Sequence, residues 1–200
     1  MIYLDNAAGS WPKPPEVGHA MVEALERYGA NPGRGGYELA RRTAEMVDGV
    51  RRQVAELINA PDRRRVVFTA GATMSLNMAL AGYLRQGDHV VYSGMEHNAV
   101  FRPLYALASS GRITFSRVTA DGDGYISAES VGKLLKPGTT LIVLCHASNV
   151  SGSVQPLEEI AALVRCKLIP LLVDAAQSVG LLPIDVQKLD IAMLALPAHK

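Results

Sequence analysis

Two segments near the start of the chain carry apolar residues at every third or fourth position. The first covers residues 15–28 and the second covers residues 43–59. This spacing predicts two amphipathic helices, because side chains three and four positions apart share one helix face. The intervening stretch ANPGRGG, residues 30–36, contains a proline and three glycines. These residue types do not readily continue a helix, so the stretch is predicted to be a loop.

From Arg65 onward, short apolar runs alternate with segments of helical period. The runs predict strands at residues 66–70, 89–93, 113–118, 141–146, 169–174 and 191–196. Helical spacing predicts helices around Leu76, Leu80 and Leu84 and at residues 100–109, 128–135 and 157–166. Strands of continuous Val, Ile and Leu are buried on both faces, which is typical of a mostly parallel sheet with helices on both sides. The predicted fold class is therefore α/β.

Composition and charge limit the classes of function. The 200 residues are 48% hydrophobic, which is enough for the core of a soluble globular domain. Twenty Lys and Arg residues balance 19 Asp and Glu residues, so we expect no nucleic-acid partner, and the basic run Arg63–Arg65 is interpreted as a solvated turn. The start of the chain lacks a charged leader before an apolar stretch, and no apolar segment approaches ~18 residues. We therefore expect no membrane association and a cytoplasmic location.

Neither the cysteines nor the acidic residues predict a metal site. Cys145 and Cys166 lack metal-type spacing and are too few for a disulfide framework, so both are interpreted as structural. The stretch DGDGY, residues 121–125, is similar to the start of a calcium loop. Such a loop needs glycine at its sixth position and an acidic residue at its twelfth, where this chain has Ile126 and Gly132.

Polar residues follow most of the predicted strands, at the place where open α/β sheets bind their ligands. In chain order these candidates are Ala72, Thr73, His97, Asn149, Asp174, Gln177, His199 and Lys200. Asp174 ends an apolar strand, where a carboxylate is destabilising unless it meets a cation. Gly71, Ala72 and Thr73 open a helix whose free N–H groups and positive dipole end suit a phosphate.

Each candidate also has a purely structural interpretation. Thr73 could be an ordinary helix N-cap, and Asp174 could cap a helix that follows its strand. His97 could be a structural histidine or a helix-start residue. The others could be loop, cap or chain-end residues, namely Asn149, Gln177 and Lys200.

Seven short motifs, in order along the chain, resemble those of class V aminotransferase-like proteins, especially cysteine desulfurases and selenocysteine lyases. They are YLDNAA (3–8), ANPGRGGYELA (30–40), FTAGAT (68–73), MEHNAV (95–100), HASNVSG (146–152), VDAAQSVG (173–180) and a final HK (199–200). The resemblance implies the large domain of the pyridoxal-5′-phosphate (PLP)-dependent transferase fold type I, truncated. It further implies an N-terminal segment at residues 1–14 and the PLP-binding domain at residues 15–200. Since family members are about twice this length, the C-terminal small domain is expected to be absent.

The resemblance implies three catalytic residues. Lys200 matches the family's Schiff-base lysine, which holds PLP covalently and later moves protons. Asp174 would face the pyridine nitrogen and keep it protonated, which would explain a carboxylate at the end of a buried strand. His97 would stack on the cofactor ring and assist proton transfer.

The same resemblance implies the remaining contacts to the cofactor. Asn149 and Gln177 would hydrogen-bond the ring oxygen and orient the ring. Ala72 and Thr73 would bind the phosphate through backbone N–H and hydroxyl groups, joined by His199.

Other residues depart from the family pattern or match it without a role. The family usually has a phosphate-binding Ser or Thr two residues before its His-Lys pair, where this chain has Pro197. Neither Cys145 nor Cys166 matches the family's sulfur-accepting cysteine, which lies beyond the Schiff-base lysine. Asn6 and Arg34 fall in motifs near the expected site entrance, and no role is assigned to them.

The resemblance implies a PLP-dependent lyase or transferase that acts on an L-amino acid. The most specific expectation is a cysteine desulfurase, which converts L-cysteine to L-alanine and passes sulfur to an acceptor protein. Another class V aminotransferase or a selenocysteine lyase is the alternative within the family. Outside enzyme chemistry the chain could be an inactive truncated module, and residues 1–200 alone are expected to be inactive. We expect the full-length protein to be a homodimer.

Overall fold

The computed structural model describes residues 2–200, and contacts divide the chain into two compact units, Met1–Val67 and Phe68–Lys200. The first unit holds the two predicted N-terminal helices, and the second holds the predicted sheet. The boundary expected after residue 14 concerns the domains of the longer family proteins, and it stays a prediction.

The first unit contains α1 (Pro15–Arg27), α2 (Glu38–Leu57) and the short 3-10 helix η1 (Arg63–Arg65). Both predicted helices are confirmed, and residues 30–36 lie in the loop between them. α2 begins at Glu38 rather than at residue 43. Its first turns extend the buried face with Ala40 and Thr43, and the Thr43 hydroxyl donates to Leu39 O at 2.9 Å. Burial of Ala40 therefore favours a helix that begins ahead of the apolar repeat.

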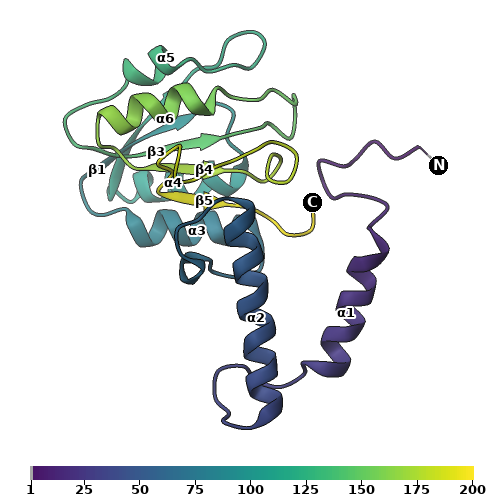
Figure 1. Ribbon diagram of the computed structural model, residues 1–200. Coiled ribbons are helices and arrows are strands. Elements are labelled where there is room, and N and C mark those ends of the chain that lie inside the picture. The colour runs from purple at the N-terminus through teal and green to yellow at the C-terminus, as the bar shows by residue number, and fades with distance from the viewer. Residues whose placement is uncertain (1) are drawn as a thin grey trace. The chain divides into compact units, whose positions relative to one another are not determined.

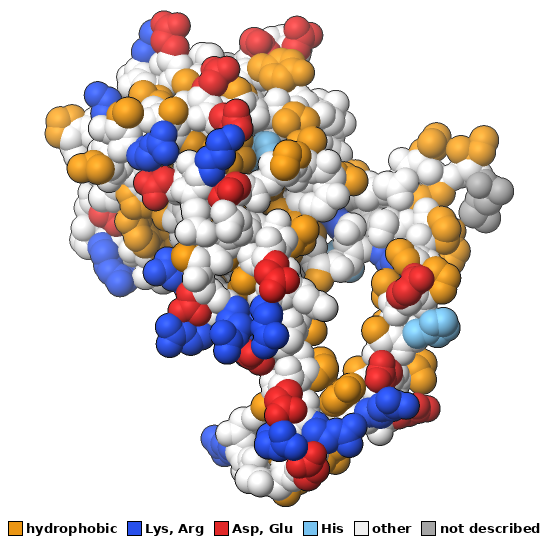
Figure 2. All heavy atoms as spheres, viewed as in Figure 1, with side chains coloured by type: hydrophobic (Ala, Val, Ile, Leu, Met, Phe, Trp, Pro, Cys, Tyr) orange, Lys and Arg blue, Asp and Glu red, His pale blue; other side chains and the backbone are white. Residues whose placement is uncertain are grey.

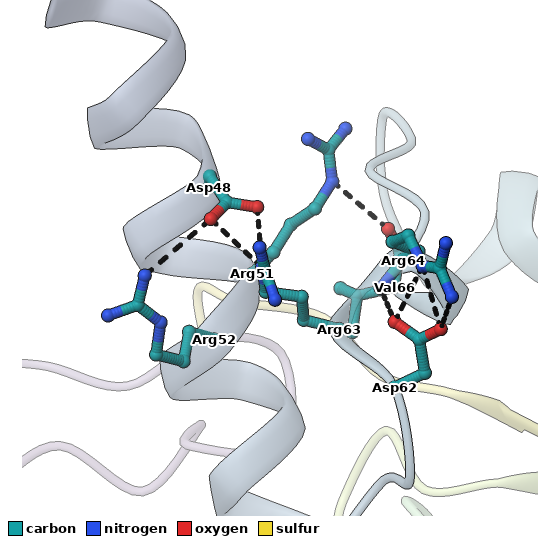
Figure 3. A network of polar contacts seen from close by, with 7 residues as sticks. All are labelled: Asp48, Arg51, Arg52, Asp62, Arg63, Arg64 and Val66. Atoms are coloured by element: carbon teal, nitrogen blue, oxygen red, sulfur yellow. Dashed lines mark hydrogen bonds and ion pairs between the residues drawn. The ribbon is translucent and has the colours of Figure 1, made fainter.

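The predicted solvated turn is the exposed helix η1, and an ion pair between Arg63 and Asp48 joins it to α2 (Figure 3). Arg63 Nε donates to both oxygens of Asp48, at 2.8 and 2.9 Å, and Arg52 lies 3.6 Å from the same carboxylate. The bond from Arg63 lowers the pKa of Asp48. Arg64 pairs with Asp62 at 2.6 Å and lowers the pKa of that carboxyl to about 2. Exposed pairs of this kind add little stability, so their main effect is to order the turn.

Residues 66–70, predicted as a strand, form no strand, and this prediction is wrong. Val67 and Phe68 are 67% and 49% exposed, so the run does not bury the surface that a central strand buries. The Thr69 hydroxyl donates to Gly71 O at 3.0 Å and lies 2.8 Å from Ser75 Oγ. These bonds fix a turn that leads into the next helix. A short apolar run does not by itself distinguish a strand from an extended loop.

The second unit is built on a five-stranded sheet in which every neighbouring pair is parallel. In the order β2-β1-β3-β4-β5, its strands are β2 (Ile113–Val118), β1 (Asp88–Ser93), β3 (Thr139–Cys145), β4 (Leu171–Asp174) and β5 (Met193–Ala195). The predicted parallel sheet is confirmed. β4 starts after Pro170, because proline has no N–H for the ladder. β5 starts later than predicted because the Ile191 N–H donates to Val186 O at 2.9 Å in a turn and does not bond to a neighbouring strand.

Helices cover both faces of this sheet, as predicted (Figure 1). They are α3 (Ala72–Tyr83), α4 (Asn98–Ser109), α5 (Ala128–Gly132) and α6 (Leu157–Cys166). Successive strand residues enter opposite cores: Val91 packs with α5 and α6, whereas Val90 and Tyr92 pack with α3 and α4. α5 is shorter than predicted because tighter turns replace its last residues, with Leu135 N–H donating to Gly132 O.

Positive and negative side chains are mixed over the face seen in Figure 2, as the net charge of +1 leads one to expect. Within residues 2–200, no helix is both long and apolar enough to cross a membrane. Nor does this part of the chain gather three side chains that could hold a metal ion. Asp121 instead accepts from Asp123 N and Tyr125 N, at 3.0 and 2.8 Å, in a turn.

His89 joins three strands of the sheet. Its Nδ1 lies 2.9 Å from Thr139 Oγ1 of β3, and its Nε2 lies 2.9 Å from Ser116 Oγ of β2. Burial lowers the pKa of His89, and the charge of Lys136 adds to the shift. Burial also lowers the pKa of His146. A protonated imidazole at either position is therefore favoured in the unfolded chain over the folded one.

We predict that the protein loses stability as the pH falls below the ordinary histidine pKa of about 6.5. The folded-state pKa of His89 lies below the unfolded one, so its contribution is complete above the unfolded value and is lost as the pH falls through the folded value. Replacing His89 with Gln should flatten this dependence and lower stability near neutral pH by about 1 kcal/mol, because bonds to two strands weaken. Urea unfolding over a pH series measures both effects. His19→Gln, at an exposed position of α1, is the control, and an unchanged slope in His89→Gln would contradict the prediction.

Candidate functional site

Asp174 is the last residue of β4 and is 3% exposed. Its Oδ1 accepts from the Ala176 N–H at 2.9 Å. Burial raises the pKa of Asp174, while that bond and the charges of His97 and Lys200 act in the opposite direction. No Lys, Arg or His nitrogen of residues 2–200 comes within ion-pair distance, 4.0 Å, of this carboxylate. The site thus has a buried acid that a cationic ligand group would stabilise.

Asp174 does not cap a helix, which was its structural alternative. The chain enters a turn at residues 176–178, and the described residues that follow form no helix there. The bond from Ala176 N–H is therefore a local turn contact that fixes the carboxylate. Neighbouring strands fix the backbone as well, because Asp174 is the register partner of Cys145 on one side and of Ala195 on the other.

His97 follows β1 and is the N-cap of α4. Its Nδ1 accepts from the Ala99 N–H at 3.1 Å, so the helix-start interpretation is confirmed. This bond also selects the tautomer, since a ring nitrogen that accepts a hydrogen bond carries no proton. In the neutral ring the proton therefore resides on Nε2. The side chain is exposed and close enough to Asp174 for the two charges to interact.

Lys200 and His199 follow β5 and are exposed. β5 pairs with β4 so that Ala195 lies opposite Asp174, and the Ala175 N–H donates to Ala195 O at 2.9 Å. The segment that carries Lys200 therefore leaves the sheet at the carboxyl end of the strands, where Asp174 lies. The charge of Lys200 acts on the Asp174 carboxyl, so these two predicted catalytic residues lie within electrostatic range.

The start of α3 lies at the same end of the sheet, beside the carboxyl ends of the strands. α3 is joined to β1 by residues 84–87 alone, so the helix runs back along the sheet and begins near the carboxyl end of β1. Gly71 precedes the helix with φ +141°, a conformation essentially restricted to glycine. Thr73 is therefore not the N-cap, and that alternative is wrong. Ala72 and Thr73 occupy the first turn, where backbone N–H groups have no intrahelical acceptor and can bind an anion.

The two amide residues lie in turns that follow β3 and β4. Asn149 is exposed in a turn whose backbone is fixed by Ser148, whose Oγ accepts from Val150 N and Ser151 N at 3.2 Å. Gln177 is partly buried in the turn after Asp174. Both lie at the carboxyl ends of their strands, and their contacts to a cofactor stay predictions.

Two buried groups at this end of the sheet, Glu96 and His146, were given no role from the sequence. Glu96 lies directly before His97, and its carboxylate is buried. His146 follows β3; its Nδ1 lies 2.9 Å from Ser178 Oγ, and its N–H donates to Asp174 O at 3.0 Å. His146 directly follows an apolar strand, which is close to the signal that identified Asp174, whereas Glu96 lies three residues beyond the end of β1 and lacks that signal.

Asn6 and Arg34 belong to the first compact unit. Asn6 Oδ1 accepts from Trp11 N at 3.2 Å, and Arg34 is exposed in its loop. Neither residue gains a role from these positions.

Comparisons with known proteins find similar sequences and folds over the whole chain. The cysteine desulfurase IscS of Vibrio vulnificus (strain YJ016) is 38% identical over 206 residues, covering 100% of this chain and 50% of that protein. The apo structure of a cysteine desulfurase from Thermococcus onnurineus NA1 matches with a TM-score of 0.91 and 31% identity, covering 100% of this chain and 50% of the other. SspA, solved in complex with cysteine, matches with a TM-score of 0.92 and 32% identity, covering 100% and 57%. The predicted fold, part of the fold type I large domain, is confirmed.

The chain spans about half the length of the curated relatives it matches. The family model for aminotransferase class-V proteins matches residues 2–200, which is the whole described chain. The chain therefore belongs to the aminotransferase class-V family.

Proposed function

We propose that the full-length protein is a PLP-dependent enzyme that acts on an L-amino acid, with L-cysteine as substrate, L-alanine as product and a protein as sulfur acceptor. The relatives named above are cysteine desulfurases, and SspA was solved with cysteine. These names favour a desulfurase over another class V aminotransferase or a selenocysteine lyase. The cytoplasmic location expected from the sequence stays a prediction.

One observation carries this proposal: the buried Asp174 carboxylate lies within electrostatic range of a lysine and a histidine. An acid buried without a contacting cation fits a ligand that brings a positive group, such as a protonated pyridine nitrogen. The first turn of α3 offers N–H groups that fit the phosphate of the same ligand. PLP, when bound, supplies an electron sink that stabilises a substrate carbanion. The donor set therefore fits the cofactor that the family implies.

Each residue of the site has a physical task under this proposal. Asp174 keeps its ligand partner protonated, because burial strengthens the attraction between the two charges. Lys200 would hold the cofactor through its amine, and its Nζ would accept or return a proton. His97 would lie against the ring and could pass on the proton of Nε2. Asn149 and Gln177 orient the ring through their amide groups.

Neither cysteine of this chain suits the role of sulfur acceptor at the site. Cys145 is buried, and its thiol donates to Ala147 O at 3.2 Å. Burial raises the pKa of Cys145, which suppresses the reactive thiolate. Cys166 ends α6, and β4 starts shortly afterwards at Leu171. This thiol therefore lies near the amino-terminal ends of the strands, whereas Asp174 lies at the carboxyl end of β4.

A homodimer is part of the proposal, and the outer sides of α3 and α4 support it. These helices expose large apolar side chains: Met74, Met78, Phe101 and Tyr105 are between 40% and 58% exposed. The rings of Phe101 and Tyr105 contact each other in a tilted arrangement, with centroids 5.9 Å apart. An exposed apolar surface of this kind is typical of a protein interface.

Lys200 is predicted to carry the cofactor in the full-length protein. Borohydride reduction of the PLP-loaded protein should fix the label on the peptide that contains Lys200, as shown by mass spectrometry. Lys200→Ala should take up no reducible label, although it can still bind PLP through the phosphate contacts. Recovery of the label on Lys167 or Lys188 would show that the catalytic lysine has been misassigned.

Asp174→Ala is predicted to lower kcat by about 100-fold or more, because a preorganised charge is lost from the reacting centre. PLP should still bind, since the phosphate contacts at α3 remain. The cofactor-free variant should unfold at the same temperature as the wild-type protein or higher, because a buried carboxylate has been removed. Asp123→Ala, at an exposed position, is the control. Near-normal kcat with full PLP occupancy in Asp174→Ala would rule out the proposed role.

The double variant Met78→Lys, Tyr105→Lys is predicted to shift the full-length protein from dimer to monomer, since two charges would be buried in the interface. Sedimentation velocity over a concentration series measures the shift. Leu181→Lys, which changes an 82% exposed residue outside α3 and α4, should leave the dimer intact. A double variant that stays dimeric at every concentration would show that these helices do not form the interface.

A further inference from the structure

Glu96 has a buried carboxyl at the carboxyl ends of the strands, where Asp174 also lies. Part of the residue is exposed, but Oε2 is buried and has no hydrogen-bond partner among residues 2–200. Oε1 accepts from the Ser93 hydroxyl and from the Cys145 N–H, each at 2.6 Å. Ser93 is the last residue of β1 and Cys145 the last of β3. One oxygen atom therefore connects the carboxyl ends of two neighbouring strands.

Oε1 of Glu96 completes a hydrogen-bond ladder that the backbone leaves unfinished. Along a central parallel strand, successive N–H groups point alternately to the two neighbouring strands. The His146 N–H donates to Asp174 O on the β4 side at 3.0 Å, so the preceding N–H, that of Cys145, points toward β1. β1 ends at Ser93, and the Glu96 side chain supplies the acceptor in place of a strand carbonyl.

This bond fixes the backbone that carries His97. On one side of His97, Glu96 is held to β1 and β3. On the other side, the Ala99 N–H holds the imidazole through Nδ1. Cys145, which donates to Glu96, is also the register partner of Asp174. A displacement of Glu96 would therefore be transmitted to His97 directly and to Asp174 through β3.

We propose that Glu96 is a positioning residue of the site: its carboxyl replaces the strand partner of Cys145 and thereby holds His97 beside Asp174. The catalytic consequence rests on the proposed function, whereas the contacts of Glu96 do not depend on it.

The neutral form of Glu96 suits this task. Burial raises the pKa of Glu96 to about 8; the bond from Ser93 opposes the shift, and the charge of Asp174 adds to it. Other titratable or charged groups of the surrounding elements are Tyr92, His97, Arg117 and Cys145. At pH 7 the carboxyl is therefore protonated, and it ionises as the pH rises through about 8. Because Oε1 accepts two bonds, the proton resides on Oε2.

The variants Glu96→Gln and Glu96→Ala separate positioning from charge. Gln keeps the accepting oxygen and carries N–H donors where the neutral acid carries its proton, so kcat should stay within about threefold of wild type. Ala leaves the Cys145 N–H without its acceptor, and kcat should fall about 100-fold with a smaller change in KM. Glu129→Gln, which removes an exposed carboxyl paired with Lys133, is the matched control. Thermal unfolding of each full-length variant verifies that it is folded.

A second readout requires no cofactor. The ¹⁵N signals of the His97 ring, identified by their loss in His97→Asn, are followed against pH in the cofactor-free full-length protein. The wild-type signals should show an inflection near pH 8 from Glu96, and Glu96→Gln should abolish it. The proposal is overturned if folded Glu96→Gln is as inactive as Glu96→Ala, or if the inflection persists in Glu96→Gln. A wild-type protein that binds no PLP but shows the Glu96-dependent inflection contradicts the proposed function and supports the positioning role.

Discussion

Burial of the Asp174 carboxylate at the carboxyl end of β4 is the constraint on which the site depends. The ladder fixes the backbone of Asp174 from both sides, through Cys145 and Ala195. A buried carboxylate without a contacting cation destabilises the folded chain. A ligand with a positive group removes that cost on binding and is stabilised in return. The cofactor-free fold is thus less stable than its apolar core would allow, and the deficit contributes to ligand affinity.

Two carboxyl groups, those of Glu96 and Asp174, lie at the carboxyl ends of the strands. Their surroundings favour different protonation states. Burial raises the pKa of both. The charges of His97 and Lys200 oppose the shift at Asp174, whereas Glu96 gains only hydrogen bonds from neutral donors. The negative charge is therefore favoured on Asp174, and the proton is favoured on Glu96. Neighbouring acids with separated roles are a common arrangement at catalytic sites.

The sequence predicted the sheet because strands and helices follow from burial periodicity, whereas the roles of the site residues follow from the family resemblance and stay predictions. The strand at residues 113–118 and the helix at residues 157–166 have the predicted bounds, since each carries a full apolar pattern and clear ends. The strand expected at residues 66–70 failed because a strand also needs a neighbour, which one short run cannot reveal. Glu96 was given no role for a related reason: its contacts to β1 and β3 depend on the order β2-β1-β3. That order is a property of the whole sheet and is not encoded near residue 96.

The structural and the catalytic interpretations of the site residues are not alternatives in the folded chain. His97 caps α4 through Nδ1, and this bond leaves the proton of the neutral ring on Nε2. Oδ1 of Asp174 accepts from the Ala176 N–H, which orients the carboxylate so that Oδ2 is left for a ligand. In each case a backbone N–H next to the residue sets the geometry of a group whose other atom can act on a substrate or cofactor. A capping contact seen at the carboxyl end of a parallel strand is therefore no argument against a functional role, because it provides the preorganisation that such a role requires.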